Sequence, residues 1–127
     1  MSEIRNPILR GFCPDPCMIR TGEDYYIATS TFEWFPCVNF FHSRDLMHWE
    51  QIESPLREPG QMDLCGVPDS GGIWAPDLSW DGQYYYLLVT NVLTKKGRWS
   101  NTHNSMSRAA ATTGPWSNPV YPTTIGF

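Results

Sequence analysis

Two aromatic stretches decide the fold of this chain: Tyr25-Tyr26-Ile27-Ala28-Thr29 and Tyr84-Tyr85-Tyr86-Leu87-Leu88-Val89. Each is rich in aromatic and β-branched residues and follows a turn signal, at Gly22 or at Asp81-Gly82, which is typical of a β-strand. A third run of this kind, Val38-Asn39-Phe40-Phe41-His42, lies between them. No segment keeps a 3.6-residue apolar period over three turns. The sequence therefore predicts an all-β fold.

The surroundings of the two stretches also repeat, at a spacing of about 62 residues. Pro14-Asp15 precedes the first stretch and Pro76-Asp77 precedes the second, and each half closes near a tryptophan, at Trp49 and at Pro115-Trp116. Each repeat is interpreted as four short antiparallel strands, which is the content of one β-propeller blade.

We expect one partial propeller domain over residues 1–127, with a first blade at about 10–60 and a second at about 70–125. A β-sandwich is the alternative, since it also uses eight short strands in this length. Sandwiches do not usually repeat every fourth strand, which favours the propeller. The secondary structure of Ser105–Thr112 is not decided by the sequence. Its Ala109-Ala110-Ala111 run favours helix, while its neighbours favour a strand edge.

Two blades cannot close a ring, and their terminal strands would expose unpaired edges. We therefore expect either that more chain follows Phe127 or that copies self-associate through the open blade edges.

Composition excludes several classes of partner. The net charge is −4 and the basic residues form no dense stripe, so no nucleic-acid partner is expected. No run approaches the roughly 18 apolar residues of a membrane span, and the N-terminus has no apolar signal region, so the predicted location is cytoplasmic. The aromatic fraction of 14% supplies flat faces that fill a core or line a sugar site.

The four cysteines are Cys13, Cys17, Cys37 and Cys65. Their spacing is not the paired pattern of a zinc site, and cytosolic thiols are normally reduced. We interpret them as free thiols, with a disulfide or a soft-metal site as the open alternatives.

Four blocks in order carry a family resemblance: Gly11-Phe12-Cys13-Pro14-Asp15-Pro16, then Tyr25–Pro36, His42–Leu46 and Pro68–Asp77. Together they resemble glycoside hydrolase family 43, nearest to its β-xylosidases, some of which also cleave α-L-arabinofuranosides. The resemblance runs from about Asn6 to the chain end and weakens over Val92–Thr113.

The resemblance implies a five-bladed propeller with its active site at the mouth of a central channel. It also implies inverting hydrolysis by three carboxylates, of which the general base falls on Asp15. The second, a modulating aspartate, would follow a Gly-Phe pair at the start of the third blade, and this chain ends at Gly126-Phe127. The general acid would lie further on, so the isolated chain is expected to be inactive.

An inverting hydrolase needs one ionised and one protonated carboxyl group, about 6.5–9.5 Å apart, to leave room for the attacking water. Pro14 and Pro16 flank Asp15, and Pro16 predicts an extended backbone at Asp15. The alternative for Asp15 alone is a turn carboxylate beside prolines.

The resemblance also implies that Trp74 and Phe32 contact the sugar, since an aromatic face stacks on the apolar face of a pyranose. For Trp34 and Phe35 the sequence does not decide whether the side chain lies in the core or in the sugar pocket. The other acidic residues near these blocks are interpreted as loop or turn residues and not as acids: Glu33, Asp69 and Asp77. No metal ligand is assigned, and whether a divalent ion occupies the central channel stays open.

Cys37 departs from the family, which usually has glycine at that position. If the backbone there has positive φ, a cysteine would be strained.

Three functions follow as hypotheses. The first is an inverting β-xylosidase or arabinofuranosidase acting on xylo-oligosaccharides or arabinosides. The second is a propeller that binds carbohydrate without cleaving it. The third is a fragment that assembles with its own copies.

Overall fold

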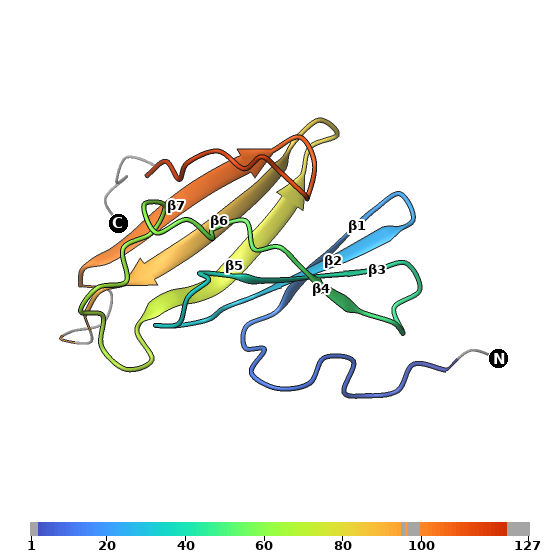
Figure 1. Cartoon of the computed structure of the whole chain (residues 1–127), viewed down its shortest axis with the longest axis horizontal. Helices are drawn as coiled ribbons and strands as arrows, with labels where there is room; N and C mark the ends of the chain where they lie inside the picture. The colour runs from blue at the N-terminus through green and yellow to red at the C-terminus, as the bar shows by residue number, and fades with distance from the viewer. Residues whose placement is uncertain (1–2, 95, 97–99, 122–127) are drawn as a thin grey trace.

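The computed structural model describes residues 3–94, 96 and 100–121 and forms two antiparallel sheets (Figure 1). The first sheet has the order β1-β2-β3-β4, with β1 at Cys17–Thr21, β2 at Asp24–Thr29, β3 at Asn39–Ser43 and β4 at Glu50–Ile52. The second has the order β5-β6-β7, with β5 at Gly72–Trp80, β6 at Tyr85–Val92 and β7 at Thr102–Ala109. The three aromatic runs are β2, β3 and β6, so the all-β prediction is confirmed.

The strands of each sheet follow one another in sequence order. This meander is the arrangement of a propeller blade, whereas a sandwich of the immunoglobulin type uses Greek-key connections. The helical alternative for Ser105–Thr112 is wrong. Ser105 pairs with Val89 and Ala109 pairs with Tyr85, so residues 105–109 form the end of β7, and residues 110–112 lie in the bend and turn that follow it.

Within the described residues the second sheet has three strands, where four were predicted from the repeat. The segment after β7 returns along it but forms only one bridge, in which Met106 and Val120 exchange two hydrogen bonds of 2.9 Å. Pro115 and Pro119 lack an N–H and cannot complete a ladder there. The remainder of the second repeat, from residue 122, lies outside the described residues.

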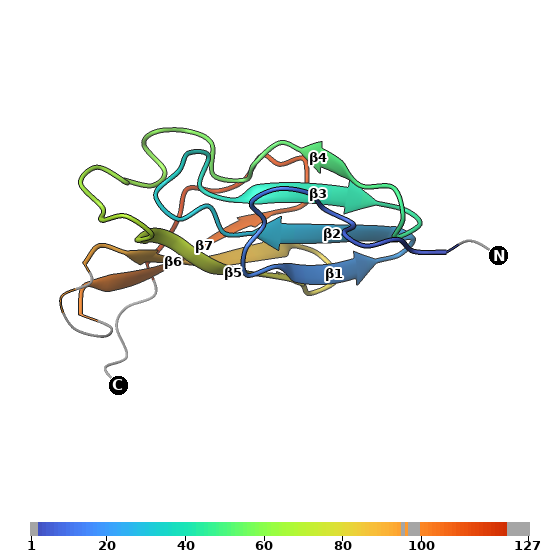
Figure 2. The ribbon, with the colours of Figure 1, turned by 90° about the horizontal axis from the view of Figure 1, so that it is seen from below.

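The core lies between the two sheets, which pack face to face (Figure 2). Tyr26 and Tyr85, one from each sheet, are in contact, with their ring centroids 5.9 Å apart. The Tyr85 hydroxyl lies 2.7 Å from the Thr21 hydroxyl. Trp116 closes the core by packing its ring at 6.1 Å from that of Phe40. The buried apolar side chains come from both repeats, so each blade completes the core of the other. They include Ala28, Val38, Ile73, Leu78, Leu87 and Val89.

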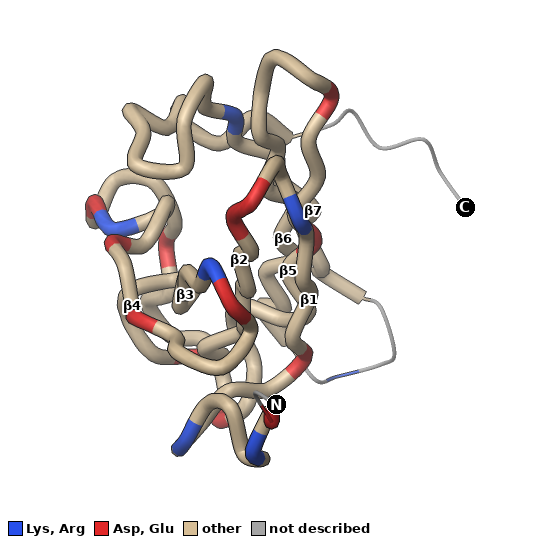
Figure 3. Tube along the Cα trace, turned by 90° about the vertical axis from the view of Figure 1, so that its right-hand side faces the viewer, with Lys and Arg blue, Asp and Glu red and all other residues tan. Residues whose placement is uncertain are grey.

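The N-terminal segment runs along the face of the first sheet that points away from the second (Figures 1 and 2). Among the described residues, Lys and Arg lie singly along the chain and are interspersed with Asp and Glu (Figure 3). Among the described residues there is no helix long and apolar enough to cross a membrane.

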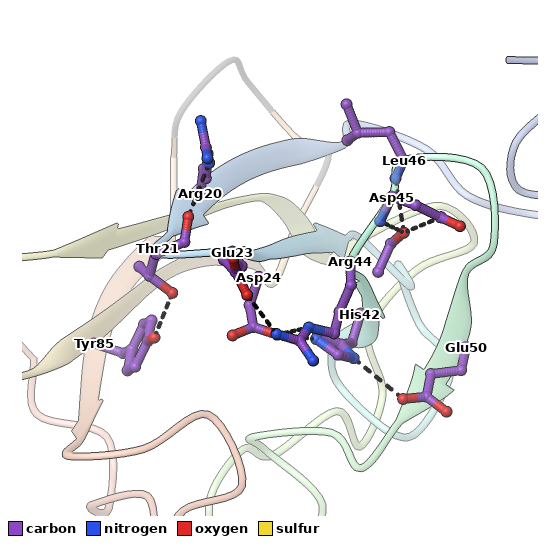
Figure 4. Close-up of polar contacts among 12 residues, drawn as sticks. Arg20, Thr21, Glu23, Asp24, His42, Arg44, Asp45, Leu46, Glu50 and Tyr85 are labelled. Atoms are coloured by element: carbon purple, nitrogen blue, oxygen red, sulfur yellow. Dashed lines mark hydrogen bonds and ion pairs between the residues drawn. The ribbon is translucent and has the colours of Figure 1, made fainter. Parts of the chain in front are cut away.

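A charged cluster ties together the hairpin end of the first sheet (Figure 4). His42 on β3 lies between Asp24 on β2, at 2.7 Å from Nε2, and Glu50 on β4, at 3.1 Å from Nδ1. Burial lowers the pKa of His42, but the hydrogen bonds to the two carboxylates outweigh it and the pKa is raised. Arg44 adds an ion pair of 2.7 Å with Glu23. This cluster lies at the opposite end of β2 from Asp15.

Candidate active site

Asp15 lies just before β1 and is exposed to solvent. Its Oδ2 accepts a hydrogen bond of 2.7 Å from the hydroxyl of Ser30, a fully buried residue that directly follows β2. The Ser30 N–H also donates to the carbonyl of Pro14 at 3.0 Å. This hydrogen bond therefore links the Asp15 carboxylate to the buried end of β2.

The backbone of Asp15 has φ 49, so the predicted extended conformation is wrong. Aspartate is among the few non-glycine residues that enter the left-handed region readily. The hydrogen bonds that Ser30 donates to Pro14 and to Asp15 itself hold this conformation against the local bias that Pro16 imposes.

Phe32 connects the two repeats through its backbone. Its N–H donates to the carbonyl of Ile73 at 3.0 Å, and its carbonyl accepts from the Ile73 N–H at 2.8 Å. The neighbouring Gly72 has φ +74, and a Cβ there would lie 2.3 Å from the Phe32 carbonyl oxygen. Only glycine allows the two backbones to approach this closely.

Three rings form what we call the aromatic row: Phe12, Phe32 and Trp74. The Phe12 and Phe32 centroids are 5.4 Å apart and those of Phe32 and Trp74 are 6.5 Å apart, both in edge-on geometry. The structure thus brings together the two aromatics named from the sequence. It adds Phe12, which is 56% exposed and which sequence reasoning missed although it lies three residues before Asp15.

The loop that precedes β5 fixes the Trp74 side chain by a hydrogen bond. Its indole Nε1 donates to the carbonyl of Ser70 at 2.9 Å, and the Ser70 N–H donates to Oε2 of Glu33 at 3.0 Å. A tight turn closes the loop, with the Gly71 N–H donating to the Pro68 carbonyl at 2.7 Å.

Backbone strain gathers in the same place. Of the five non-glycine residues with positive φ in the described part of the chain, three belong here: Asp15, Phe32 and Ser70. Such residues cost about 1–3 kcal/mol each and persist where surrounding contacts determine them, often at functional sites. Their clustering marks this region as the candidate site.

Other residues singled out from the sequence lie differently. Asp77 is inside β5, beyond a bulge between Trp74 and Asp77, so it is not the positional equivalent of Asp15, as the repeat had suggested. Trp34 and Phe35 are 67% and 50% exposed and do not belong to the core. Asp69 is an exposed loop residue. The Gly126-Phe127 pair lies outside the described residues.

All four cysteines are unpaired. Cys37 is fully buried and is not among the residues with positive φ, so the expected strain does not arise. Burial raises its pKa to about 11. Burial also raises the pKa of Cys17, whereas Cys65 is exposed. Over residues 3–94, 96 and 100–121, no three His, Cys, Asp or Glu side chains gather into a set that could hold a metal ion.

Asp15 lies three residues after Phe12, and its partner Ser30 lies two residues before Phe32, so the carboxylate and the aromatic row belong to the same part of the fold. The rings offer apolar faces to a sugar, and a carboxylate can take a proton from water. The two sequential antiparallel sheets place the chain in the β-propeller class, with Asp15 and the aromatic row as its candidate site.

Comparison with known proteins gives the family. The model described as glycosyl hydrolases family 43 matches residues 4–126, and the chain belongs to this family. The predicted resemblance is thereby confirmed. The related enzymes of known structure are five-bladed β-propellers, which agrees with two propeller blades here.

Among its relatives, the chain is 53% identical over 127 residues to "Xylosidase/arabinosidase 43B" of Humicola insolens, covering 100% of this chain and 24% of that protein. It is 46% identical to the "Beta-xylosidase" of Bacillus subtilis, covering 98% and 24%. The crystal structure of a xylan beta-1,4-xylosidase from Bacillus halodurans C-125 matches with a TM-score of 0.91 and 51% identity, covering 98% and 24%. The chain therefore spans about a quarter of the length of these proteins.

Proposed function

We propose that this chain supplies the general base and part of the sugar subsite of an inverting glycosidase that acts on β-xylosides or α-L-arabinofuranosides. One observation carries the proposal: in a family 43 chain, the Asp15 carboxylate accepts a hydrogen bond from Ser30, which lies two residues before Phe32 of the aromatic row. The names of the relatives support the choice of xylose and arabinose substrates.

In this proposal Asp15 deprotonates the attacking water. The Ser30 hydroxyl donates to Oδ2 and sets the orientation of the carboxylate, so Oδ1 is the oxygen that takes the proton. Trp74 and Phe32 present their rings to the sugar and orient its anomeric carbon toward that water.

The leaving oxygen needs a proton from a second carboxyl group about 6.5–9.5 Å from the base. The family resemblance assigns that group to sequence beyond Phe127. We therefore propose that the 127-residue chain alone does not hydrolyse glycosides.

The test is a chimera in which this chain replaces the matching quarter of the Bacillus subtilis β-xylosidase. It is assayed with 4-nitrophenyl β-D-xylopyranoside. Cleavage is expected, and Asp15→Asn is expected to lower kcat about 10²–10⁴-fold, as removal of a general base does. Asp77→Asn is the matched control and should stay within about twofold.

A chimera that cleaves the xyloside equally well with Asp15→Asn would refute the assignment. A folded chimera that binds xylose without cleaving the xyloside would instead favour the carbohydrate-binding alternative.

Cytoplasmic location and self-association through blade edges stay proposals. Four unpaired thiols support the first, since reduced cysteines are usual in the cytosol. Cell fractionation tests the location. Native mass measurement tests self-association, and a strictly monomeric chain would rule it out.

A further inference from the structure

Glu33 supplies no acid in the proposed reaction, yet its carboxylate is engaged by the other repeat. Its Oε2 accepts the N–H of Ser70, a residue 37 positions further along the chain. The carbonyl of the same Ser70 accepts the indole N–H of Trp74. One residue therefore connects the Glu33 carboxylate to the Trp74 ring, through two hydrogen bonds of 3.0 and 2.9 Å.

The loop between them needs such an anchor. Ser70 has φ 58, a left-handed conformation that a serine adopts only when contacts hold it. The adjacent turn is tight, because a Cβ on Gly71 would lie 2.8 Å from the Pro68 carbonyl oxygen. A carboxylate that accepts the Ser70 N–H makes a charge-assisted hydrogen bond, which is stronger than a neutral one.

Glu33 is itself firmly placed. It directly follows Phe32, whose backbone exchanges two hydrogen bonds with Ile73, and Ile73 directly precedes Trp74. Trp74 is thus held from two sides, by its own backbone next to this bridge and by its indole through Ser70. The result is the edge-on contact of 6.5 Å between the Trp74 and Phe32 rings.

We propose that Glu33 is a positioning residue that sets the Trp74 ring for the sugar. The part of the proposal that concerns the sugar rests on the function proposed above, whereas the coupling of Glu33 to Trp74 does not.

The coupling is tested in the full chain by ¹H–¹⁵N NMR of the tryptophan indole groups. The Trp74 signal is identified by its loss in Trp74→Phe. In Glu33→Ala the Trp74 indole proton is expected to exchange with solvent at least about tenfold faster, because its acceptor is no longer held. Glu33→Gln keeps an acceptor oxygen and should stay within about twofold.

The chain offers matched controls for this measurement. Trp49 and Trp116 also donate their indole N–H to backbone carbonyls, at 3.1 Å each, so their exchange should be unchanged in Glu33→Ala. Asp69→Ala removes a neighbouring carboxylate of the same loop and should not alter the Trp74 signal. Faster exchange at all three tryptophans would indicate general destabilisation and would overturn the coupling, as would no change at Trp74.

The role toward the sugar is tested in the chimera described above. Glu33→Ala is expected to raise KM for the xyloside about tenfold with kcat within about threefold, since a lost stacking surface weakens ground state and transition state alike. Glu33→Gln should restore KM. If the indole signal responds but KM does not, the coupling stands and the role of Trp74 at the sugar is wrong. That result is distinct from failure of the Asp15 assignment, which is read from the kcat of Asp15→Asn.

Discussion

Replacing Gly72 with alanine tests the contact that joins the two repeats. An added Cβ would lie 2.3 Å from the carbonyl oxygen of Phe32. That oxygen accepts the Ile73 N–H at 2.8 Å, so the alanine cannot be accommodated while both hydrogen bonds of the bridge remain.

The expected loss of stability has three sources. The left-handed backbone costs alanine about 1–2 kcal/mol relative to glycine. Forcing backbone apart in a packed region costs about 1–3 kcal/mol, and each lost hydrogen bond costs about 1 kcal/mol. Alanine offsets about 0.4–1 kcal/mol by restricting the unfolded chain. The net expectation is about 4 kcal/mol, a large part of the 5–15 kcal/mol typical of a domain.

Gly66 provides a matched control, because its φ of +73 is nearly the same and nothing lies within 4 Å of an added Cβ. Gly66→Ala should therefore cost only about 1 kcal/mol. Urea unfolding followed by tryptophan fluorescence measures both variants, and the two should differ by about 3 kcal/mol, or about 2 M in midpoint. Equal losses in Gly72→Ala and Gly66→Ala would refute the steric reasoning.

Three further predictions concern other parts of the chain. Because folding raises the pKa of His42, its contribution to stability is complete below about pH 6.5 and is lost as pH rises through the raised value. The fall in urea midpoint between about pH 6 and 8 should be larger in the wild type than in His42→Gln; an equal fall would contradict the assignment. A reagent that forms a mixed disulfide with free thiols should label exposed Cys65 in the native chain, and buried Cys37 only after unfolding. Equal labelling rates of Cys65 and Cys37 in the native chain would contradict the burial of Cys37. A double-mutant cycle of Thr21→Val and Tyr85→Phe should give a coupling of about 1 kcal/mol from their 2.7 Å hydrogen bond, and a value near zero would show that the bond contributes nothing.

The strands could be predicted because their signals are local. The aromatic run of β2 and the preceding Gly22 act within one hairpin, and the same holds for β6 and Gly82. Where a long-range contact competes with a local preference, the sequence left the choice between helix and strand open. The run of alanines from Ala109 favours helix locally, but pairing of β7 with β6 places Ala109 in the sheet, and Ala110 and Ala111 lie in the bend after it.

The site shows the same division. Asp15, Phe32 and Trp74 could be named from motifs in the sequence. The partners that hold them could not, because Ser30 lies 15 positions from Asp15 and Ser70 lies 37 positions from Glu33. No local pattern reports which hydroxyl or carboxylate meets a given backbone group across such a separation.

By itself, then, the sequence determined the all-β class, the repeat and the blocks that carry the family, since all of these depend on residue type and spacing along the chain. Only the tertiary structure decided the left-handed backbone of Asp15, the joining of the repeats at Phe32 and Ile73, and the aromatic row that includes Phe12. Those features arise from hydrogen bonds and ring contacts between segments that are brought together by folding, and their energies outweigh the local preferences of a proline or a serine.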